Sequence, residues 1–243
     1  MYNFLKSVVK NIIPQEILIK NEDNFRKLIK PFYKGKNHEC TICSAHLKKF
    51  AVLHNGQLVC PVCGSLPRTR RLSQLLDQEF LKPRMTFLDF SPSRMLYKKW
   101  KKRNDISYFP TDFENEFLSD YQFDITNIGT ESEKFDLIVC YHILEHIVDD
   151  KKAMSELYRV LKNGGTALIQ TPFKDGEIYE NYNIVTPEDR LKHFGQEDHV
   201  RIYSVSGLKE RLQSVGFKAE VKVFDENIYQ GFAKNEIVMV CKK

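Results

Sequence analysis

The sequence predicts an α/β protein in which a doubly wound, seven-stranded sheet follows a small cysteine-containing module. Three observations support this. From Met85 onward, short apolar strands alternate with helices, which is typical of a parallel sheet with right-handed crossovers. The last two strands, about 219–224 and 236–241, have no helix between them, so we expect an antiparallel C-terminal hairpin. Ahead of Met85, two Cys-x-x-Cys pairs mark off the module.

Composition indicates a soluble globular protein with one core of ordinary size and a small appendage. The chain has 243 residues, of which 42% are hydrophobic and 28% are charged. Its net charge of +5 falls short of the basic stripe of a dedicated nucleic-acid binder. We find no apolar run of the roughly 20 residues that span a bilayer. Lys6 and Lys10 interrupt the N-terminal apolar positions, so we expect no signal peptide and a cytoplasmic protein.

Residues 1–38 are predicted to form an N-terminal helical arm. Apolar residues recur at helical spacing from Phe4 to Ile12, and Pro14 ends that run. A second short helix is expected over residues 22–29. We expect the arm to pack either on the main domain or on a partner subunit. The alternative is a membrane-surface helix, because lysines flank the apolar face, although that basic face is thin.

Residues 39–67 are predicted to form a zinc ribbon. Two tight cysteine pairs supply four thiolates, the ligand set that tetrahedral Zn²⁺ prefers; they are Cys40, Cys43, Cys60 and Cys63. In a reducing compartment, clustered cysteines are metal ligands rather than disulfides. The segment between the pairs reads as a hairpin with an Asn55-Gly56 turn. So small a unit depends on its metal for much of its folding energy.

A linking helix over residues 68–84 opens with Arg68, Arg70 and Arg71 and runs to about Leu81. The following domain, 85–243, begins with a strand. Ser91-Pro92 then reads as an N-cap followed by proline at the first helical position. Asn163-Gly164-Gly165 ends a later helix, and Gly216 closes the last one. The predicted strands before the final hairpin are 85–90, 106–109, 121–125, 135–140 and 166–170, and the predicted helices are 93–103, 151–161 and 206–215.

Residues 172–203 are predicted to form a long polar loop after the fifth strand, over the substrate side of the site. Such a loop is often a lid or a binding segment, although an ordinary solvated loop is the alternative. Of the two cysteines outside the ribbon, Cys140 and Cys241 lie in apolar strand-like runs, so we expect both to be buried in the core.

The domain resembles class I S-adenosylmethionine-dependent methyltransferases. The resemblance is carried by Phe135-Asp136-Leu137-Ile138-Val139-Cys140-Tyr141-His142-Ile143-Leu144-Glu145-His146-Ile147 and by Glu156-Leu157-Tyr158-Arg159-Val160-Leu161-Lys162-Asn163-Gly164-Gly165. It implies that the chain is a methyltransferase with a methyltransferase-type sheet. The segment Cys60-Pro61-Val62-Cys63-Gly64-Ser65 is also similar to a subgroup of bacterial methyltransferases associated with surface-sugar biosynthesis.

The resemblance implies S-adenosylmethionine as cofactor, at the carboxyl ends of the strands. This rule places it against Asp89, Phe90 and Ser91, and against Cys140 and His142. An acid just after the second strand can accept both ribose hydroxyls, which assigns that role to Asp112. The resemblance places Asp124 near the adenine amino group. The family usually has acid-x-G-x-G-x-G after the first strand, whereas this chain has Asp89-Phe90-Ser91-Pro92-Ser93-Arg94, without glycine.

An alcohol acceptor needs a proton acceptor, and histidine suits that task. The candidate bases are His142, just past the fourth strand, and His193 and His199 in the long loop. The leading hypothesis is therefore O-methylation of a small or carbohydrate-like acceptor by in-line displacement. One alternative is an RNA methyltransferase that grips RNA with its zinc module. Another is a non-catalytic binding protein with this fold. The oligomeric state remains open.

Overall fold

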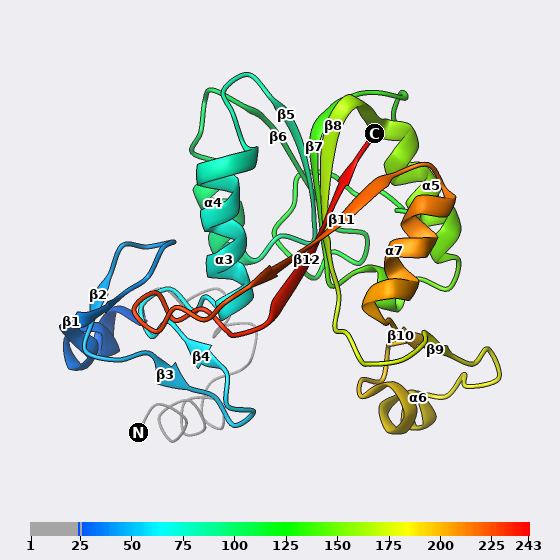
Figure 1. The fold of residues 1–243 in the computed structure, drawn as a ribbon. Coiled ribbons are helices and arrows are strands. Elements are labelled where there is room, and N and C mark those ends of the chain that lie inside the picture. The colour runs from blue at the N-terminus through cyan, green and yellow to red at the C-terminus, as the bar shows by residue number, and fades with distance from the viewer. Residues whose placement is uncertain (1–23, 25) are drawn as a thin grey trace. The chain divides into compact units, whose positions relative to one another are not determined.

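The computed structural model describes residues 24 and 26–243, and the chain forms two compact units (Figure 1). Unit 1 comprises the chain up to Glu79 together with Phe224–Glu236. Unit 2 comprises Phe80–Val223 and Ile237–Lys243. The segment between the last two strands thus belongs with the N-terminal module, which no local sequence pattern predicts.

Unit 1 contains short strands around the cysteine pairs. Residues 26–33 are helical, and the elements that follow are β1 (Lys34–Glu39), β2 (His46–Leu47), β3 (Ala51–Val52), β4 (Leu58–Val59) and α3 (Pro67–Leu75). Strands β3 and β4 pair antiparallel, and Gly56 turns the hairpin with a φ of 79°. The predicted Asn-Gly hairpin is therefore present. The linking helix continues beyond α3 as a π-helical turn, η1 (Leu76–Phe80).

Arg70 holds unit 1 together from its centre. The residue is fully buried, and its guanidinium stacks 4.3 Å from the centroid of the Phe50 ring. It donates to the backbone carbonyls of Ser65 at 2.6 Å and Gln230 at 3.0 Å, and to that of Gly231. Because buried guanidinium donors need acceptors, these carbonyls fix the 224–236 segment against α3.

Unit 2 is built on a six-stranded sheet with the order β11-β12-β8-β7-β5-β6. Its strands are β5 (Thr86–Phe90), β6 (Ser107–Thr111), β7 (Phe135–Tyr141), β8 (Leu161–Gln170), β11 (Lys218–Phe224) and β12 (Glu236–Lys242). Strand β5 runs parallel to β6 and to β7, and β7 runs parallel to β8, whereas β12 is antiparallel to β8. The sheet is mixed, as the helix-free C-terminal connection predicts.

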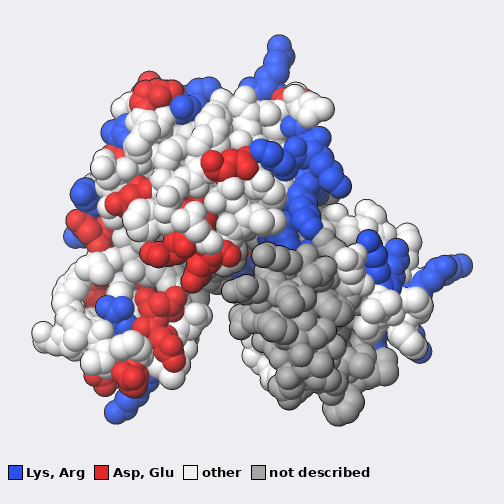
Figure 2. All heavy atoms as spheres, turned by 180° about the vertical axis from the view of Figure 1, so that it is seen from behind, with Lys and Arg blue, Asp and Glu red and all other residues white. Residues whose placement is uncertain are grey.

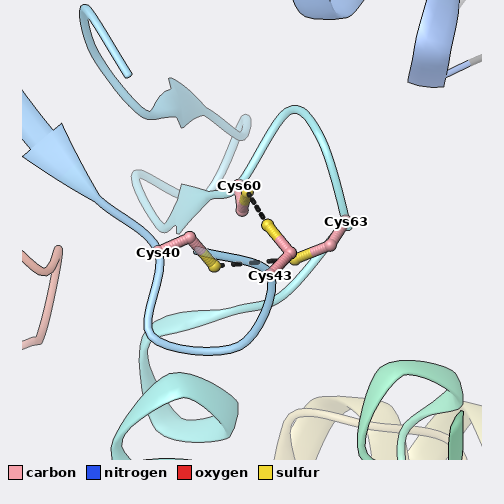
Figure 3. Close-up of side chains that lie close together, drawn as sticks. All are labelled: Cys40, Cys43, Cys60 and Cys63. Atoms are coloured by element: carbon pink, nitrogen blue, oxygen red, sulfur yellow. Dashed lines mark hydrogen bonds between the residues drawn. The ribbon is translucent and has the colours of Figure 1, made fainter. Parts of the chain in front are cut away.

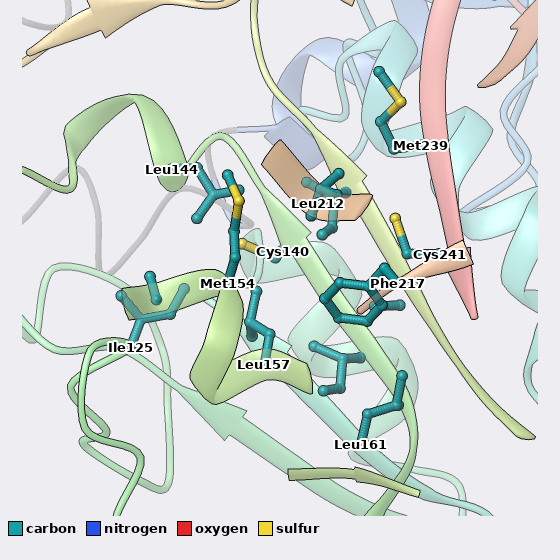
Figure 4. Packing of buried hydrophobic residues seen from close by; sticks show 14 of the residues in the cluster. Ile125, Cys140, Leu144, Met154, Leu157, Leu161, Leu212, Phe217, Met239 and Cys241 are labelled. Carbon is teal, nitrogen blue, oxygen red and sulfur yellow. The ribbon is translucent and has the colours of Figure 1, made fainter. Parts of the chain in front are cut away.

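Helices cover both faces of this sheet: α4 lies on one face, and α5 and α7 lie on the other (Figure 1). They are α4 (Arg94–Trp100), α5 (Asp150–Val160) and α7 (Val205–Ser214). The side chains of Asp149 and Ser204 cap the N-termini of α5 and α7. Figure 4 shows the apolar cluster that fills the space beside α5 and α7 and includes Cys140 and Cys241, so the prediction that both are buried is confirmed.

The predicted count of seven strands is wrong, because residues 121–125 form isolated bridges instead of a strand. Pro110 in β6 has no N–H to offer a further strand. Its carbonyl accepts from Asp120 and Tyr121 together, and Phe123 donates to the Thr111 hydroxyl rather than to a backbone carbonyl. These hydrogen bonds do not follow the pattern of a β-ladder, so residues 121–125 do not form a strand beside β6.

The predicted structureless loop at 172–203 is also wrong. It contains β9 (Tyr179–Glu180), α6 (Pro187–Phe194) and β10 (Arg201–Ile202). Thr186 caps α6, Pro187 opens it, and Gly195 ends it with a φ of 86°. Likewise, α5 ends at Val160, and the expected Gly-Gly turn lies inside β8.

No helix in the part of the chain that the structure describes is long and apolar enough to cross a membrane. The first predicted helix of the N-terminal arm lies outside the described residues.

Candidate active site

Three strand ends bring candidate residues to one edge of the sheet in unit 2. Phe90, the last residue of β5, pairs in register with Thr111 of β6 and with Cys140 of β7. The residues that follow these strands therefore leave the sheet together. Ser91 donates its backbone N–H to the Thr111 carbonyl at 2.7 Å, and His142 donates its own to Gln170 at 2.8 Å.

Two of these residues adopt left-handed backbone conformations without being glycine. Ser91 has a φ of 44° and His142 a φ of 57°. This conformation costs a side-chain-bearing residue about 1–3 kcal/mol and is concentrated at functional sites. Ser91 lies in the glycine-free turn after β5, and it adopts a glycine-like conformation there.

Asp112 is buried, and its carboxylate organises the turn after β6. One oxygen accepts the Ser91 hydroxyl at 2.6 Å, and the other accepts the backbone N–H groups of Glu116 at 2.6 Å and Phe117 at 3.1 Å. Beside it, the Phe113 ring is 53% exposed. A carboxylate and an exposed aromatic face thus lie on one short turn.

Asp89 is buried within unit 2 and accepts the Tyr108 hydroxyl at 2.9 Å. Burial raises the pKa of the Asp89 carboxyl to about 7, although the bond from Tyr108 lowers it. The carboxyl thus retains a proton at pH values where an exposed aspartate is ionised.

The other predicted cofactor residues have different surroundings. Phe90 and Cys140 belong to the buried apolar cluster, and burial raises the pKa of the Cys140 thiol well above its usual value. Their side chains are thus committed to the core. The Asp124 carboxylate accepts the backbone N–H and the hydroxyl of Thr126, both at 2.8 Å. It forms a local turn within residues 121–125, the region where the third strand was expected.

His142 lies against a buried carboxylate, Glu145, which is not among the predicted site residues. Its Nδ1 is 3.2 Å from Oε1 of Glu145, a residue only 1% exposed in the short helix η2 (Leu144–His146). Burial raises the pKa of Glu145, but the hydrogen bond and charge of His142 outweigh it, so the pKa lies below the ordinary value. Nε2 of His142 has no hydrogen-bond partner among residues 24 and 26–243.

The two histidines of the 172–203 segment differ. His193 on α6 is exposed, and its Nδ1 lies 2.8 Å from the Tyr179 hydroxyl. His199 is buried, and its ring lies 4.7 Å, centroid to centroid, from the His146 ring. Burial and the neighbouring His146 lower the pKa of His199. His199 therefore packs against His146 at the end of η2, while the hydrogen bond of His193 joins α6 to β9.

Arg201, which lies in the predicted loop segment 172–203, has a structural role. It is fully buried and donates to Glu180 at 2.9 Å and to the carbonyls of Leu144 and Val148 at 3.1 and 2.8 Å. Glu180 also pairs with Arg211. This network holds the turn after η2 against β9 and β10.

The four cysteines of unit 1 point toward one another (Figure 3). The Sγ atoms of Cys40 and Cys63 are 3.6 Å apart and those of Cys43 and Cys60 are 3.8 Å apart, and all four lie within 4.8 Å of one another. A tetrahedral Zn²⁺ with bonds of about 2.3 Å to sulfur separates its ligands by about 3.8 Å. The cluster therefore has the dimensions of a four-thiolate zinc site.

A family model described as a methyltransferase domain matches residues 66–221. The chain belongs to this methyltransferase family. The matched span includes the three strand ends described above, which confirms the prediction of a methyltransferase. The family match starts after the cysteine pairs, so it does not test the predicted ribbon. A comparison with curated proteins gives no match.

Three methyltransferases are among the solved structures that are similar to this chain. A SAM-dependent methyltransferase from Archaeoglobus fulgidus is 14% identical with a TM-score of 0.53, over 72% of this chain and 93% of that one. Phosphoethanolamine N-methyltransferase 2 from Haemonchus contortus, in complex with phosphomonomethylethanolamine and S-adenosylhomocysteine, is 16% identical with a TM-score of 0.50. The CurJ carbon methyltransferase is 16% identical with a TM-score of 0.47. This chain spans 52% of each of the latter two chains, with 72% of its own length.

Proposed function

We propose that the methyltransferase transfers a methyl group from S-adenosylmethionine to an oxygen of a small or carbohydrate-like acceptor. The observation that carries the proposal is the meeting of Ser91, Asp112 and His142 at one edge of the sheet, two of them in strained conformations. The fold of the Archaeoglobus and Haemonchus enzymes supports the choice of cofactor. Binding at this edge also follows the general rule for open α/β sheets.

The residues at this edge fit an adenosyl group. A carboxylate offers about four acceptor positions, and Asp112 uses three of them within the protein. One ribose hydroxyl takes the fourth, and a second takes the place of the Ser91 hydroxyl. The exposed Phe113 ring offers a stacking face for adenine. The cofactor supplies a methyl group on a sulfonium that is its own leaving group.

His142 is proposed to accept the proton of the acceptor hydroxyl. Nδ1 faces Glu145, so Nε2 is left for the acceptor. The buried carboxylate orients the ring and stabilises the imidazolium that forms when the proton arrives. This arrangement favours His142 over His193 and His199 as the base. Exposed polar and aromatic side chains of the 179–203 segment, including Tyr182 and Asp198, suit a polar acceptor.

Replacing His142 by Gln tests the base. We expect kcat to fall about 10²–10⁴-fold, because general-base catalysis is lost. The affinity for S-adenosylhomocysteine, measured by calorimetry, should stay unchanged. His193→Gln is the matched control and should retain activity. Equal losses in both variants, or full activity of His142→Gln, would remove His142 from the mechanism.

Calorimetry with S-adenosylhomocysteine also tests the cofactor site. Asp112→Asn should weaken binding at least about tenfold, because a charge-assisted hydrogen bond contributes about 1.5–3 kcal/mol. Asp124→Asn, which alters a local turn, is the comparison. If the unaltered chain does not bind S-adenosylhomocysteine, the enzymatic hypothesis fails and the non-catalytic alternative is favoured.

We further propose that Cys40, Cys43, Cys60 and Cys63 bind a structural Zn²⁺. Two observations support this proposal: four thiolates are a ligand set that Zn²⁺ prefers, and the distances between their sulfur atoms match those around one tetrahedral ion. Elemental analysis of protein purified without chelator should detect zinc, and Cys43→Ser should lose it.

RNA remains the second candidate acceptor. Figure 2 shows Lys and Arg side chains gathered along one edge of the face in view. However, Lys101 pairs with Asp120 and Arg103 with Asp105, which reduces the net charge of the basic run at residues 98–103. RNA binding that weakens steeply with salt would favour this alternative.

A further inference from the structure

A second group of metal-type ligands lies in unit 2, apart from the cysteines. Glu145, His146 and His199 each place one ligand atom within 4.8 Å of the others. The His146 and His199 rings meet edge to face, at 89° to one another. Two imidazoles and one carboxylate are a donor set used for divalent first-row transition metals.

Burial makes the carboxylate of this group unusual. Glu145 is 1% exposed, and its Oε2 has no hydrogen-bond partner within the described residues. Its Oε1 lies 3.2 Å from Nδ1 of His142. A buried carboxylate costs several kcal/mol unless it is paired and hydrogen-bonded. Among the residues that the structure describes, its second oxygen, Oε2, has no cation or donor that compensates for burial.

Each histidine is oriented through one nitrogen, so the other is left for an ion. Nδ1 of His146 is 3.0 Å from Oδ2 of Asp198, which leaves Nε2. The His199 ring is hydrogen-bonded to the backbone of Phe194. Metal-binding histidines characteristically have such outer partners, carboxylate or backbone carbonyl, which fix the ring and its tautomer.

The backbone that carries these residues is fixed from both sides. Val200 donates its N–H to the Glu145 carbonyl at 2.9 Å, which joins the strand-end turn to the 199–201 segment. Arg201 donates to carbonyls on both sides of His146, at Leu144 and Val148. Ligands that are held in place before an ion arrives bind it without a large ordering cost.

We propose that Glu145, His146 and His199 form a binding site for one divalent first-row transition metal ion, such as Zn²⁺, Fe²⁺ or Co²⁺. Three protein ligands leave at least one coordination position open for water or another oxygen ligand. The proposal concerns metal binding itself and does not depend on methyl transfer or on the identity of the acceptor.

The test is metal binding by the full chain, with Co²⁺ as the probe after the cysteine site has been filled with Zn²⁺. We expect one further Co²⁺ per chain, with weak visible bands and none of the sulfur-to-metal charge-transfer absorption of a thiolate site. Co²⁺ should also raise the melting temperature of the unaltered protein. His146→Ala should abolish both effects, and His193→Ala, the matched control in the same unit, should retain both.

An outer-partner variant guards against misfolding of His146→Ala. The Asp198 side chain is 67% exposed, so Asp198→Asn should fold normally. It should weaken Co²⁺ binding about 10–100-fold, as loss of such partners does, while Glu197→Gln leaves it unchanged. If the unaltered chain takes up no Co²⁺ beyond the cysteine site, the proposal is overturned. Equal uptake by His146→Ala with unchanged affinity in Asp198→Asn would overturn it as well.

Discussion

Ser91 combines an unfavourable backbone conformation with a favourable hydrogen bond. Its φ of 44° is one that glycine adopts freely, while its hydroxyl donates to the buried Asp112 carboxylate. The absence of glycine from this turn is therefore accommodated by strain, and the serine hydroxyl offsets part of that cost. A glycine-free sequence does not by itself exclude the turn conformation.

Paired substitutions at this position separate the two effects. Ser91→Ala loses the hydrogen bond and keeps the strained φ, whereas Ser91→Gly loses the bond and the strain together. We expect Ser91→Gly to be about 1 kcal/mol more stable than Ser91→Ala in urea unfolding. Equal stabilities would show that the backbone at residue 91 is not held in the left-handed region.

Asp89 makes the stability of the protein depend on pH. Because its folded pKa of about 7 lies above the unfolded value of about 3.9, the folded state keeps a proton that the unfolded state releases. This contribution is fully present below pH of about 4 and is lost as the pH rises through 7.

The unaltered protein should therefore lose stability, on the order of a few kcal/mol, between pH of about 4 and 7, and Asp89→Asn should not show this loss. The amide oxygen can still accept the Tyr108 hydroxyl. Urea unfolding at a series of pH values is the measurement, with the exposed Asp175→Asn as control. Parallel pH profiles for Asp89→Asn and the unaltered protein would contradict the assignment.

At the scale of elements, local sequence signals predict much of the fold. The buried run Phe135–Tyr141 and the final two strands are found within a few residues of their predicted limits. Helix α6 carries an N-cap, a first-position proline and a terminal glycine, and these signals were present in Thr186, Pro187 and Gly195. The histidines and acids near its end drew attention to function instead.

Other features depend on tertiary contacts that no local pattern reveals. The missing third strand follows from Pro110 and the Thr111 hydroxyl on the neighbouring strand. The partnership of His142 with Glu145 could have been suspected from their i, i+3 spacing, since a buried acid beside a candidate base is a common arrangement. The tyrosine that faces Asp89 lies 19 residues away, on a parallel strand.

Gly231 in the 224–236 segment is predicted to be intolerant of a side chain. Its φ is 65°, and an added Cβ would lie 2.4 Å from the Phe50 ring and 2.8 Å from the Arg70 guanidinium. Gly231→Ala should lower the free energy of unfolding by about 2–4 kcal/mol, through strain and overpacking. The matched control is Gly56→Ala, which has a φ of 79° but open space. Gly56→Ala should lower the free energy of unfolding by about 1 kcal/mol. If thermal melts of the two variants show similar losses of stability, the close approach at Gly231 is contradicted.

On the scale of the whole molecule, unit 1 is discontinuous, because its Phe224–Glu236 segment lies far along the chain from the cysteines. Two contacts inside this unit join its segments. The Arg70 guanidinium donates hydrogen bonds to backbone carbonyls such as that of Gln230, and Arg71 forms an ion pair with Glu236 at 3.4 Å. If the cysteines hold a structural metal, removing that metal should make both segments of unit 1 lose their order together.

Removal of the metal should therefore expose two separated parts of the chain to protease at once. Limited proteolysis after treatment with a strong chelator, followed by mass spectrometry, should show cuts within residues 34–79 and within 224–236. The rest of unit 2 should remain resistant for longer, since its core is formed by its own sheet and helices. Cuts confined to the first segment would show that the two parts are not one cooperative unit.

The division of the chain also limits how it can be shortened. A fragment that starts at residue 80 retains all six strands of the large sheet yet leaves Phe232 and Gly231 without the ring and guanidinium that cover them. Expression of such a fragment should give poor solubility, and replacing 224–236 with a short polar turn should restore it. Supplying residues 24–79 as a separate peptide offers a second route to recovery.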